Sequence, residues 1–231
     1  MQRKKSLPIG FIIIRTISNA LIIGAVFYLV LLIWPIVKAE ASYRLNRWRG
    51  IRYTVDEGKP VVIEKPSPGA RYFKRLAQEP TPIKITPISK EFGIIIEKIG
   101  VNAPVVADVD SSNYEAYMEA LRHGVAQAKG TKKPGEVGNT YIHGHSTLNF
   151  WQMGKYATVF TLLNKVVVGD RVVTFYKGNR YDYEVIRKEI FQGFDITPLL
   201  RDYDEPMLTL QTCDPPGTSL NRLIVTAKLV N

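Results

Sequence analysis

Cysteine and histidine are scarce in this sequence. Its 231 residues contain one cysteine, Cys213, and three histidines, His123, His143 and His145. The sequence contains no zinc-finger spacing, Walker motif, arginine-rich tract or internal repeat. These absences argue against the common metal-stabilised and nucleic-acid-binding classes, and they make the single thiol the most informative residue.

The positive charge of the chain is confined to its N-terminal part. Residues 1–92 carry 16 Lys and Arg against 6 Asp and Glu, whereas residues 93–231 carry 15 of each. A basic segment of this kind suits a membrane surface or an anionic cell-wall polymer. We therefore expect no nucleic-acid partner.

A long uncharged run lies near the N-terminus. The 22 residues 16–37 have no charged side chain, which is enough to cross a hydrocarbon core of about 30 Å as a helix. Residues 39–41, Ala-Glu-Ala, resemble a cleavage site, but the apolar run exceeds the roughly 7–15 residues of a cleavable signal. Residues 1–41 are therefore predicted to form an uncleaved N-terminal signal-anchor. Basic residues on both sides of the run leave its orientation undecided.

The next segment, residues 42–92, has no sustained helical or strand period and contains six scattered prolines. This composition predicts a basic, proline-rich juxtamembrane stalk that is extended and semi-rigid. Only residues 71–76 have the pattern of a short helical turn.

From residue 93 onward, short apolar runs alternate with turns. A capping box at residues 112–115 predicts a helix that ends at Gly124, and a second short helix is predicted around 150–163. The rest has the pattern of strands with no βαβ rhythm, so residues 93–231 are expected to form an all-β barrel or sandwich. The predicted strands are 93–99, 103–106, 141–143, 171–176, 180–191, 207–212 and 222–230, with turns at 100–102 and 177–179.

Cys213 stands at the end of an alternating apolar run and directly before a turn. Pro215 and Pro216 have no N–H to continue a sheet ladder, so the chain must reverse and return as the strand that Arg222 opens. If the two strands are neighbours, Arg222 lies near Cys213 at the rim of the sheet. A thiolate needs positive surroundings, and an unpaired thiol in an exported protein is a liability unless it is used. We therefore favour a nucleophilic cysteine over a buried structural one.

The histidines supply candidates for a base. His143 and His145 are two residues apart and share a face if the strand continues. His145 follows Gly144, where the strand gives way to a loop, and is the better candidate for a reactive imidazole. His143 is expected to pack within the strand, and His123, near a helix end, is expected to be structural or solvated.

Together these segments resemble the sortases, the membrane-anchored cysteine transpeptidases of bacterial cell surfaces. Thr209-Leu-Gln-Thr-Cys213 fits the Thr-Leu-x-Thr-Cys signature of that family, and Asn221-Arg222-Leu-Ile-Val fits its arginine strand. Pro134-Gly-Glu-Val-Gly-Asn139 with Ile142-His-Gly-His145 is similar to the histidine strand. Ile99-Gly-Val-Asn-Ala-Pro104 and Gly169-Asp-Arg-Val-Val173 are similar to two further strand regions, so the resemblance spans residues 93–231. The family usually has a small or apolar residue where this chain has His143.

The resemblance implies a closed eight-stranded β-barrel with one or two short helices. It implies that Cys213 attacks the carbonyl of an LPxTG-like C-terminal sorting motif to give a thioester, that His145 acts as acid and base, that Arg222 stabilises the oxyanion, and that Thr212 binds the substrate. The implied partners are secreted proteins bearing the motif and an amine acceptor of the cell wall or pilin. The implied location is the bacterial cytoplasmic membrane, crossed once, with the N-terminus inside and the catalytic domain outside.

Three other interpretations were weighed. His143, His145 and Cys213 could form a His₂Cys zinc site, the same residues could serve a hydrolytic cysteine protease, or the domain could be non-enzymatic. No metal ligand and no cofactor is predicted, and the scattered acidic residues do not decide whether calcium is required. The stalk contains no Asp-Pro-aromatic lid motif, so a pilin-polymerising subtype is not indicated.

Overall fold

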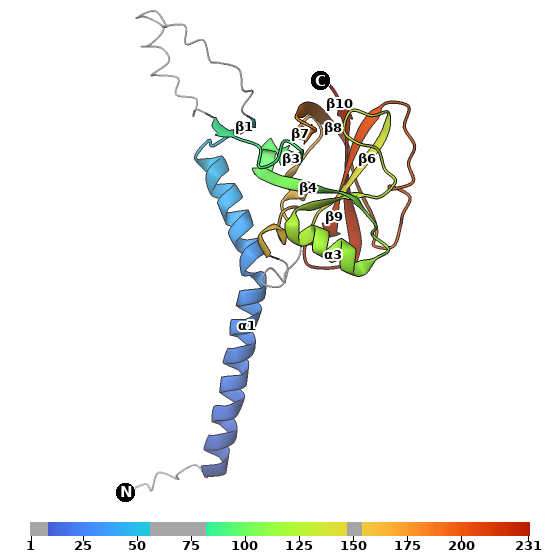
Figure 1. Cartoon of the computed structure of the whole chain (residues 1–231). Helices are drawn as coiled ribbons and strands as arrows, with labels where there is room; N and C mark the ends of the chain where they lie inside the picture. Colours follow the sequence, from blue (N-terminus) through green and yellow to red (C-terminus); the bar gives the residue numbers. More distant parts are fainter. Residues whose placement is uncertain (1–8, 56–81, 147–153) are drawn as a thin grey trace, which may run out of the picture.

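The computed structural model describes residues 9–55, 82–146 and 154–231, and consists of one long helix, a two-stranded sheet and a closed barrel (Figure 1). The barrel has eight strands in the order β10-β8-β7-β3-β4-β5-β6-β9, with β9 and β10 closing the ring. The pairs β4–β5 and β6–β9 are parallel, and the others are antiparallel. The predicted closed eight-stranded barrel is thus confirmed. Its strands are β3 (Phe92–Ile96), β4 (Val101–Val109), β5 (Val125–Ala128), β6 (Gly138–His143), β7 (Arg171–Tyr176), β8 (Asn179–Gln192), β9 (Pro206–Asp214) and β10 (Asn221–Leu229).

The two faces of the barrel strands bury different sets of side chains. Because successive side chains of a strand point to opposite faces, Leu210 and Leu223 enter the main core, whereas Ile224 belongs to a separate cluster with Tyr141. By the same alternation, Cys213 and Arg222 lie on the face opposite to the main core. The candidate site is therefore on the outside of the barrel, where other elements can cover it.

One short feature of the barrel differs from the sequence prediction, and another agrees with it. The chain turns at a 3₁₀ segment, η1 (Glu97–Ile99), and at Gly100 with φ 66°, so Val101 already belongs to β4 and the turn falls earlier than 100–102. The predicted hairpin between β7 and β8 is present as a two-residue turn in which Lys177 and Gly178 both have positive φ. That pair of conformations matches the twist of the adjoining strands.

The helices of the barrel domain are shorter than predicted. α3 (Tyr114–His123) is capped by Asn113, whose side chain accepts a hydrogen bond from Ala116 N–H, and Ser112 instead bonds to Asp110. The helix ends at Gly124, as expected. In the described part of the predicted helix 150–163 the chain forms turns and a 3₁₀ segment, η2 (Gly154–Tyr156), and a further 3₁₀ segment, η3 (Leu163–Lys165), follows.

The N-terminal helix is much longer than the apolar run. α1 (Ile9–Trp48) has 40 residues, is long and apolar enough to cross a membrane, and extends well beyond the barrel (Figure 1). Residues 42–48 are therefore helical rather than extended, and the helix stops just before Gly50, which has φ 69°. The short helical turn predicted at 71–76 lies outside the described residues.

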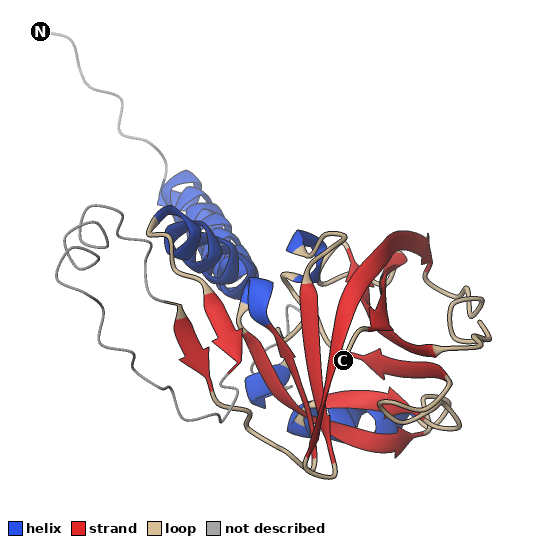
Figure 2. Ribbon diagram, turned by 90° about the horizontal axis from the view of Figure 1, so that it is seen from above, coloured by secondary structure: helices blue, strands red, loops and turns tan. Residues whose placement is uncertain are grey.

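A small parallel sheet connects α1 to the barrel. β1 (Tyr53–Val55) and β2 (Ile83–Ile85) lie between the end of α1 and the barrel (Figure 2). Val55 and Ile85 pack on the outer side chains of β3 and β7, and Glu97 accepts a hydrogen bond from Val55 N–H. The ion pair between Glu40 and Lys165, at 3.0 Å, adds a direct contact between α1 and the barrel domain.

The barrel has a definite orientation relative to α1. α3 lies at the end nearer to the apolar half of α1, and the C-terminus lies at the opposite end (Figure 1).

A buried carboxylate stabilises the strands near that opposite end. Asp182 is 1% exposed, accepts hydrogen bonds from Arg171 and Arg180, and donates its backbone N–H to Asn231. We expect Asp182→Ala to lower the free energy of unfolding by about 2–3 kcal/mol, because the carboxylate anchors two cations. Denaturant unfolding checks this, with the exposed neighbour Glu184→Ala as the matched control. Equal stability of the two variants would contradict it.

Candidate active site

Strand register brings Cys213 and Arg222 together. β9 and β10 pair antiparallel with Cys213 directly opposite Arg222, and side chains at such positions are about 5 Å apart at Cβ. The turn that Pro215 and Pro216 impose makes this pairing possible. The predicted proximity of the two residues is therefore confirmed. The guanidinium is oriented by hydrogen bonds that it donates to the carbonyl oxygens of Ser219 and Asn221, at 3.3 and 3.1 Å.

His145 lies just past the end of β6, in a segment that β9 holds in place. Gly144 N–H donates to the carbonyl of Gln211, and Thr212 Oγ1 donates to the carbonyl of Gly144 at 2.9 Å. Ser146 Oγ donates to the carbonyl of Cys213 at 3.0 Å. A side chain at Gly144 would overlap the ring of Phe160, so glycine is required for this close packing. The imidazole and the thiol are thus fixed to the same strand end.

These side chains line one cavity of about 370 Å³. Tyr117 of α3 borders it on one side, and the connection between β8 and β9 borders it on another. The lining residues are Ser111, Tyr117, His143, Gly144, His145, Gly193, Phe194, Asp195, Ile196, Leu199, Gln211, Thr212, Cys213 and Arg222.

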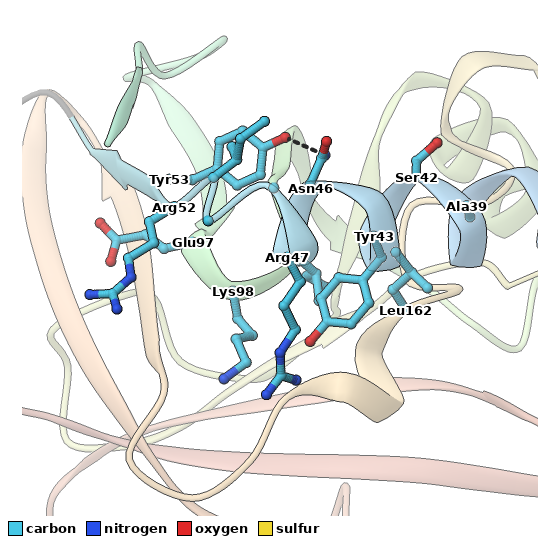
Figure 3. A pocket seen from close by; sticks show the side chains of 14 residues that line it. Ala39, Ser42, Tyr43, Asn46, Arg47, Arg52, Tyr53, Glu97, Lys98 and Leu162 are labelled. Atoms are coloured by element: carbon cyan, nitrogen blue, oxygen red, sulfur yellow. Dashed lines mark hydrogen bonds between the residues drawn. The ribbon is translucent and has the colours of Figure 1, made fainter. Parts of the chain in front are cut away.

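A larger cavity, of about 730 Å³, lies elsewhere, between the end of α1 and η1. Figure 3 shows Arg47 and Lys98 extending in the same direction from its two walls, with Tyr43 beside them. The two cavities have no lining residue in common, so the larger cavity is separate from the one that contains Cys213.

Burial sets the protonation states at the candidate site. It raises the pKa of the Cys213 thiol above its usual value, and the positive charge of Arg222 opposes this rise without cancelling it. Burial also lowers the pKa of His145 to about 4. At neutral pH the site therefore holds a thiol and a neutral imidazole, rather than a thiolate and an imidazolium.

This electrostatic arrangement predicts how Cys213 reacts with an alkylating agent. Because only the thiolate reacts, the iodoacetamide rate should keep rising with pH beyond the point at which N-acetylcysteine levels off. Arg222→Gln should shift the profile further toward alkaline pH, since it removes the charge that lowers the pKa. Intact mass measured over time at each pH checks both shifts. A plateau already reached at neutral pH would contradict the assignment.

The other residues singled out in the sequence occupy different places. Thr212 is 4% exposed, and its hydroxyl holds the Gly144 carbonyl, so its binding of substrate stays a prediction. His143 is buried in β6 as predicted, but it also lines the Cys213 cavity, which was not foreseen. His123 is exposed at the end of α3.

The His₂Cys zinc interpretation is not supported by the geometry. His143, His145 and Cys213 all belong to the described residues, and no group of three His, Cys, Asp or Glu side chains within those residues could hold a metal ion. The three side chains line a common cavity without converging on one point as ligands.

Several residues of the cavity were missed in the sequence. Tyr117 was assigned only to the apolar face of a helix, yet burial beside Cys213 raises its pKa to about 12. Residues of the segment 193–199, between β8 and β9, supply much of the opposite wall. No local pattern marks either, because both reach the site through tertiary packing.

The fold and the site together define the class of this protein. A closed eight-stranded barrel has a thiol, a guanidinium and an imidazole that line one cavity on its outside. The family model described as the Sortase domain matches residues 94–230. The chain belongs to the sortase family.

Solved structures agree with this assignment. Sortase C1 of GBS pilus island 1 is 28% identical with a TM-score of 0.50, over 61% of this chain and 64% of that chain. The Clostridium perfringens sortase D5 transpeptidase is 26% identical with a TM-score of 0.50, over 70% and 89%. Sortase A from Corynebacterium diphtheriae, a lid mutant, is 23% identical with a TM-score of 0.51, over 85% and 94%, and supports the fold alone. The chain thus spans less than two thirds of the first of these relatives. No curated protein matches it.

Proposed function

We propose that this protein is a membrane-anchored cysteine transpeptidase that cleaves an LPxTG-like sorting motif and joins the acyl part to an amine. The observation that carries the proposal is the register that sets Cys213 opposite Arg222, in a cavity shared with His145. Family membership supports the general activity, and the residue roles are our assignments.

In the first half-reaction the Cys213 sulfur attacks the scissile carbonyl. Because the resting imidazole of His145 is neutral, it can accept the thiol proton as the C–S bond forms. The resulting imidazolium then gives that proton to the leaving amine when the C–N bond breaks. Arg222 stabilises the negative charge on the carbonyl oxygen, and the product is a thioester on Cys213.

In the second half-reaction an amine attacks the thioester carbonyl. His145, neutral again, accepts the proton from the attacking amine and returns it to the departing Cys213 sulfur. A new amide bond replaces the thioester and the thiol is restored, so cutting and joining use one site. The acceptor is an amine of the cell wall or of a pilin.

The proposal includes the arrangement of the chain at the membrane. Residues 1–41 act as a signal-anchor in the bacterial cytoplasmic membrane with the N-terminus inside. Residues 42–92 connect it to a catalytic domain, residues 93–231, on the outside, where sorting-motif substrates are found. A reporter fused after Asn231 should be found outside the cytoplasm. A fusion whose reporter is found in the cytoplasm would overturn this topology.

The direct test is the trapping of the acyl-enzyme. The full chain in detergent micelles is incubated with Leu-Pro-x-Thr-Gly-like peptides without an amine, and intact mass is measured. We expect a hydroxylamine-sensitive adduct on the wild type and none on Cys213→Ala. No adduct on folded wild-type protein with any peptide would count against the proposal.

A hydrolytic cysteine protease is the alternative that uses the same residues. It differs only in whether water or an amine resolves the thioester. Triglycine added to the trapped enzyme separates the two: a transpeptidase releases mainly the triglycine-joined peptide, whereas a hydrolase releases the free acid.

A further inference from the structure

His143 is a buried imidazole whose hydrogen-bonding groups have no partner. His143 is 7% exposed, and neither Nδ1 nor Nε2 of its ring has a hydrogen-bond partner among the described residues. The carboxamide oxygen of the nearby Gln211 is already engaged, because it accepts a hydrogen bond from the Tyr141 hydroxyl. Buried polar groups in folded proteins are nearly always bonded, so an imidazole without a partner points to a ligand.

Two aromatic rings hold the His143 side chain in place. The ring of Tyr117 lies edge-on at a centroid distance of 5.7 Å, and the ring of Tyr141 is tilted at 5.1 Å. Burial, followed by the charge of Arg222, lowers the pKa of His143 to about 4, so the ring is neutral at neutral pH. A neutral imidazole has one N–H donor and one acceptor nitrogen.

The register places His143 within reach of a peptide bound at Cys213. His143 pairs with Gln211, which precedes Cys213 by two residues, and all three side chains lie on the outer face of the barrel. One strand spacing and two residue steps separate His143 from Cys213, or about 8 Å at Cα. An extended peptide covers that distance in two to three residues. Both histidine and thiol line the same cavity.

We infer that His143 is a specificity-determining residue that hydrogen-bonds an uncharged polar side chain of the sorting motif, a carboxamide, at one of the three positions before the threonine of the scissile bond. The inference rests on the proposed transpeptidase function. A carboxamide both donates and accepts, so it can pair with whichever ring nitrogen faces the cavity, whether or not that nitrogen carries the proton. An aliphatic side chain can pair with neither nitrogen, a carboxylate can pair only with the nitrogen that carries the proton, and Arg222 repels a cation.

The test compares peptides that differ at one position. Each of the three residues before the threonine of the motif is set to Leu, Asn, Gln or Asp, and kcat/KM for acylation is measured with the full chain in detergent. At one position the wild type should prefer Asn or Gln to Leu. His143→Leu should reduce that preference about tenfold, because one lost hydrogen-bonding residue is worth about this much. His143→Gln, which keeps a donor and an acceptor, should retain it, and His123→Leu should match the wild type.

The preference is a ratio within one protein sample, so partial unfolding of a variant does not change it. An unchanged ratio in His143→Leu at all three positions, or an equal loss with every peptide, would show a structural role and overturn the inference.

A binding measurement separates this inference from the proposed function. Calorimetry with Cys213→Ala tests the same peptides without chemistry. If no peptide acylates the wild type, but carboxamide peptides bind Cys213→Ala and the added His143→Leu abolishes their preference, the His143 contact stands and the transpeptidase proposal fails. Binding without any dependence on His143 would refute the contact whatever the activity.

Discussion

His145→Ala is expected to lower kcat/KM for peptide acylation by about 10²–10⁴-fold at neutral pH. The reason is the protonation state of the site. Burial keeps Cys213 as a thiol and His145 as a neutral imidazole, so His145→Ala removes the proposed acceptor of the thiol proton. The loss should shrink as pH rises, because hydroxide then forms the thiolate without a base. Peptide acylation rates across a pH series measure both effects.

The control for this prediction is His123→Ala, which changes an exposed imidazole at the end of α3 and should behave as the wild type. Alkylation of Cys213 at high pH should be unaffected in His145→Ala, since the thiol itself is intact. A loss of activity that stays constant over the whole pH range would contradict the role of general base.

Arg222→Ala is expected to lower kcat/KM for acylation by about 10²–10³-fold, the usual loss when a group that stabilises an oxyanion is removed. The guanidinium is already oriented by the carbonyl oxygens of Ser219 and Asn221, so its charge is in place before the oxyanion forms. Arg222→Lys should recover only part of the rate. Lysine keeps the charge but lacks the planar array of donors.

Lys228→Ala is the matched control for Arg222. It removes a cation from the same strand, where Lys228 pairs with Glu205 at the surface at 2.6 Å, and should leave acylation unchanged. Thermal unfolding of each variant separates a lost fold from lost chemistry. Equal rates for Arg222→Ala and the wild type in folded protein would remove Arg222 from the mechanism.

Much of the pairing of β9 with β10 could be predicted from the sequence because local chemistry determines it. Pro215 and Pro216 end the strand that contains Cys213, and the apolar run that starts at Arg222 needs a partner strand. The two strands are close in sequence, so a hairpin between them is expected. The register that puts Arg222 opposite Cys213 is the outcome. The hairpin at Lys177 and Gly178 was predictable for the same reason.

The cavity walls could not be predicted in this way. Tyr117 reaches the site because α3 packs across the sheet, and the β8–β9 connection reaches it by covering the outer face. Both depend on contacts between distant parts of the chain.

The length of α1 was underestimated for a different reason. Residues 38–48 contain neither proline nor glycine to stop a helix, so the helix continues through them. Their apolar residues show only a weak helical period, and for that reason the sequence did not indicate a helix here.

The position of α3 relative to α1 bears on how substrates arrive. α3 carries Tyr117 to the Cys213 cavity and lies at the barrel end nearer to the apolar half of α1 (Figure 1). With α1 across a bilayer, α3 and the cavity wall that it supplies are on the lipid-proximal side of the barrel, and the C-terminus is on the far side. A substrate held close to the membrane surface would then meet this end of the barrel first.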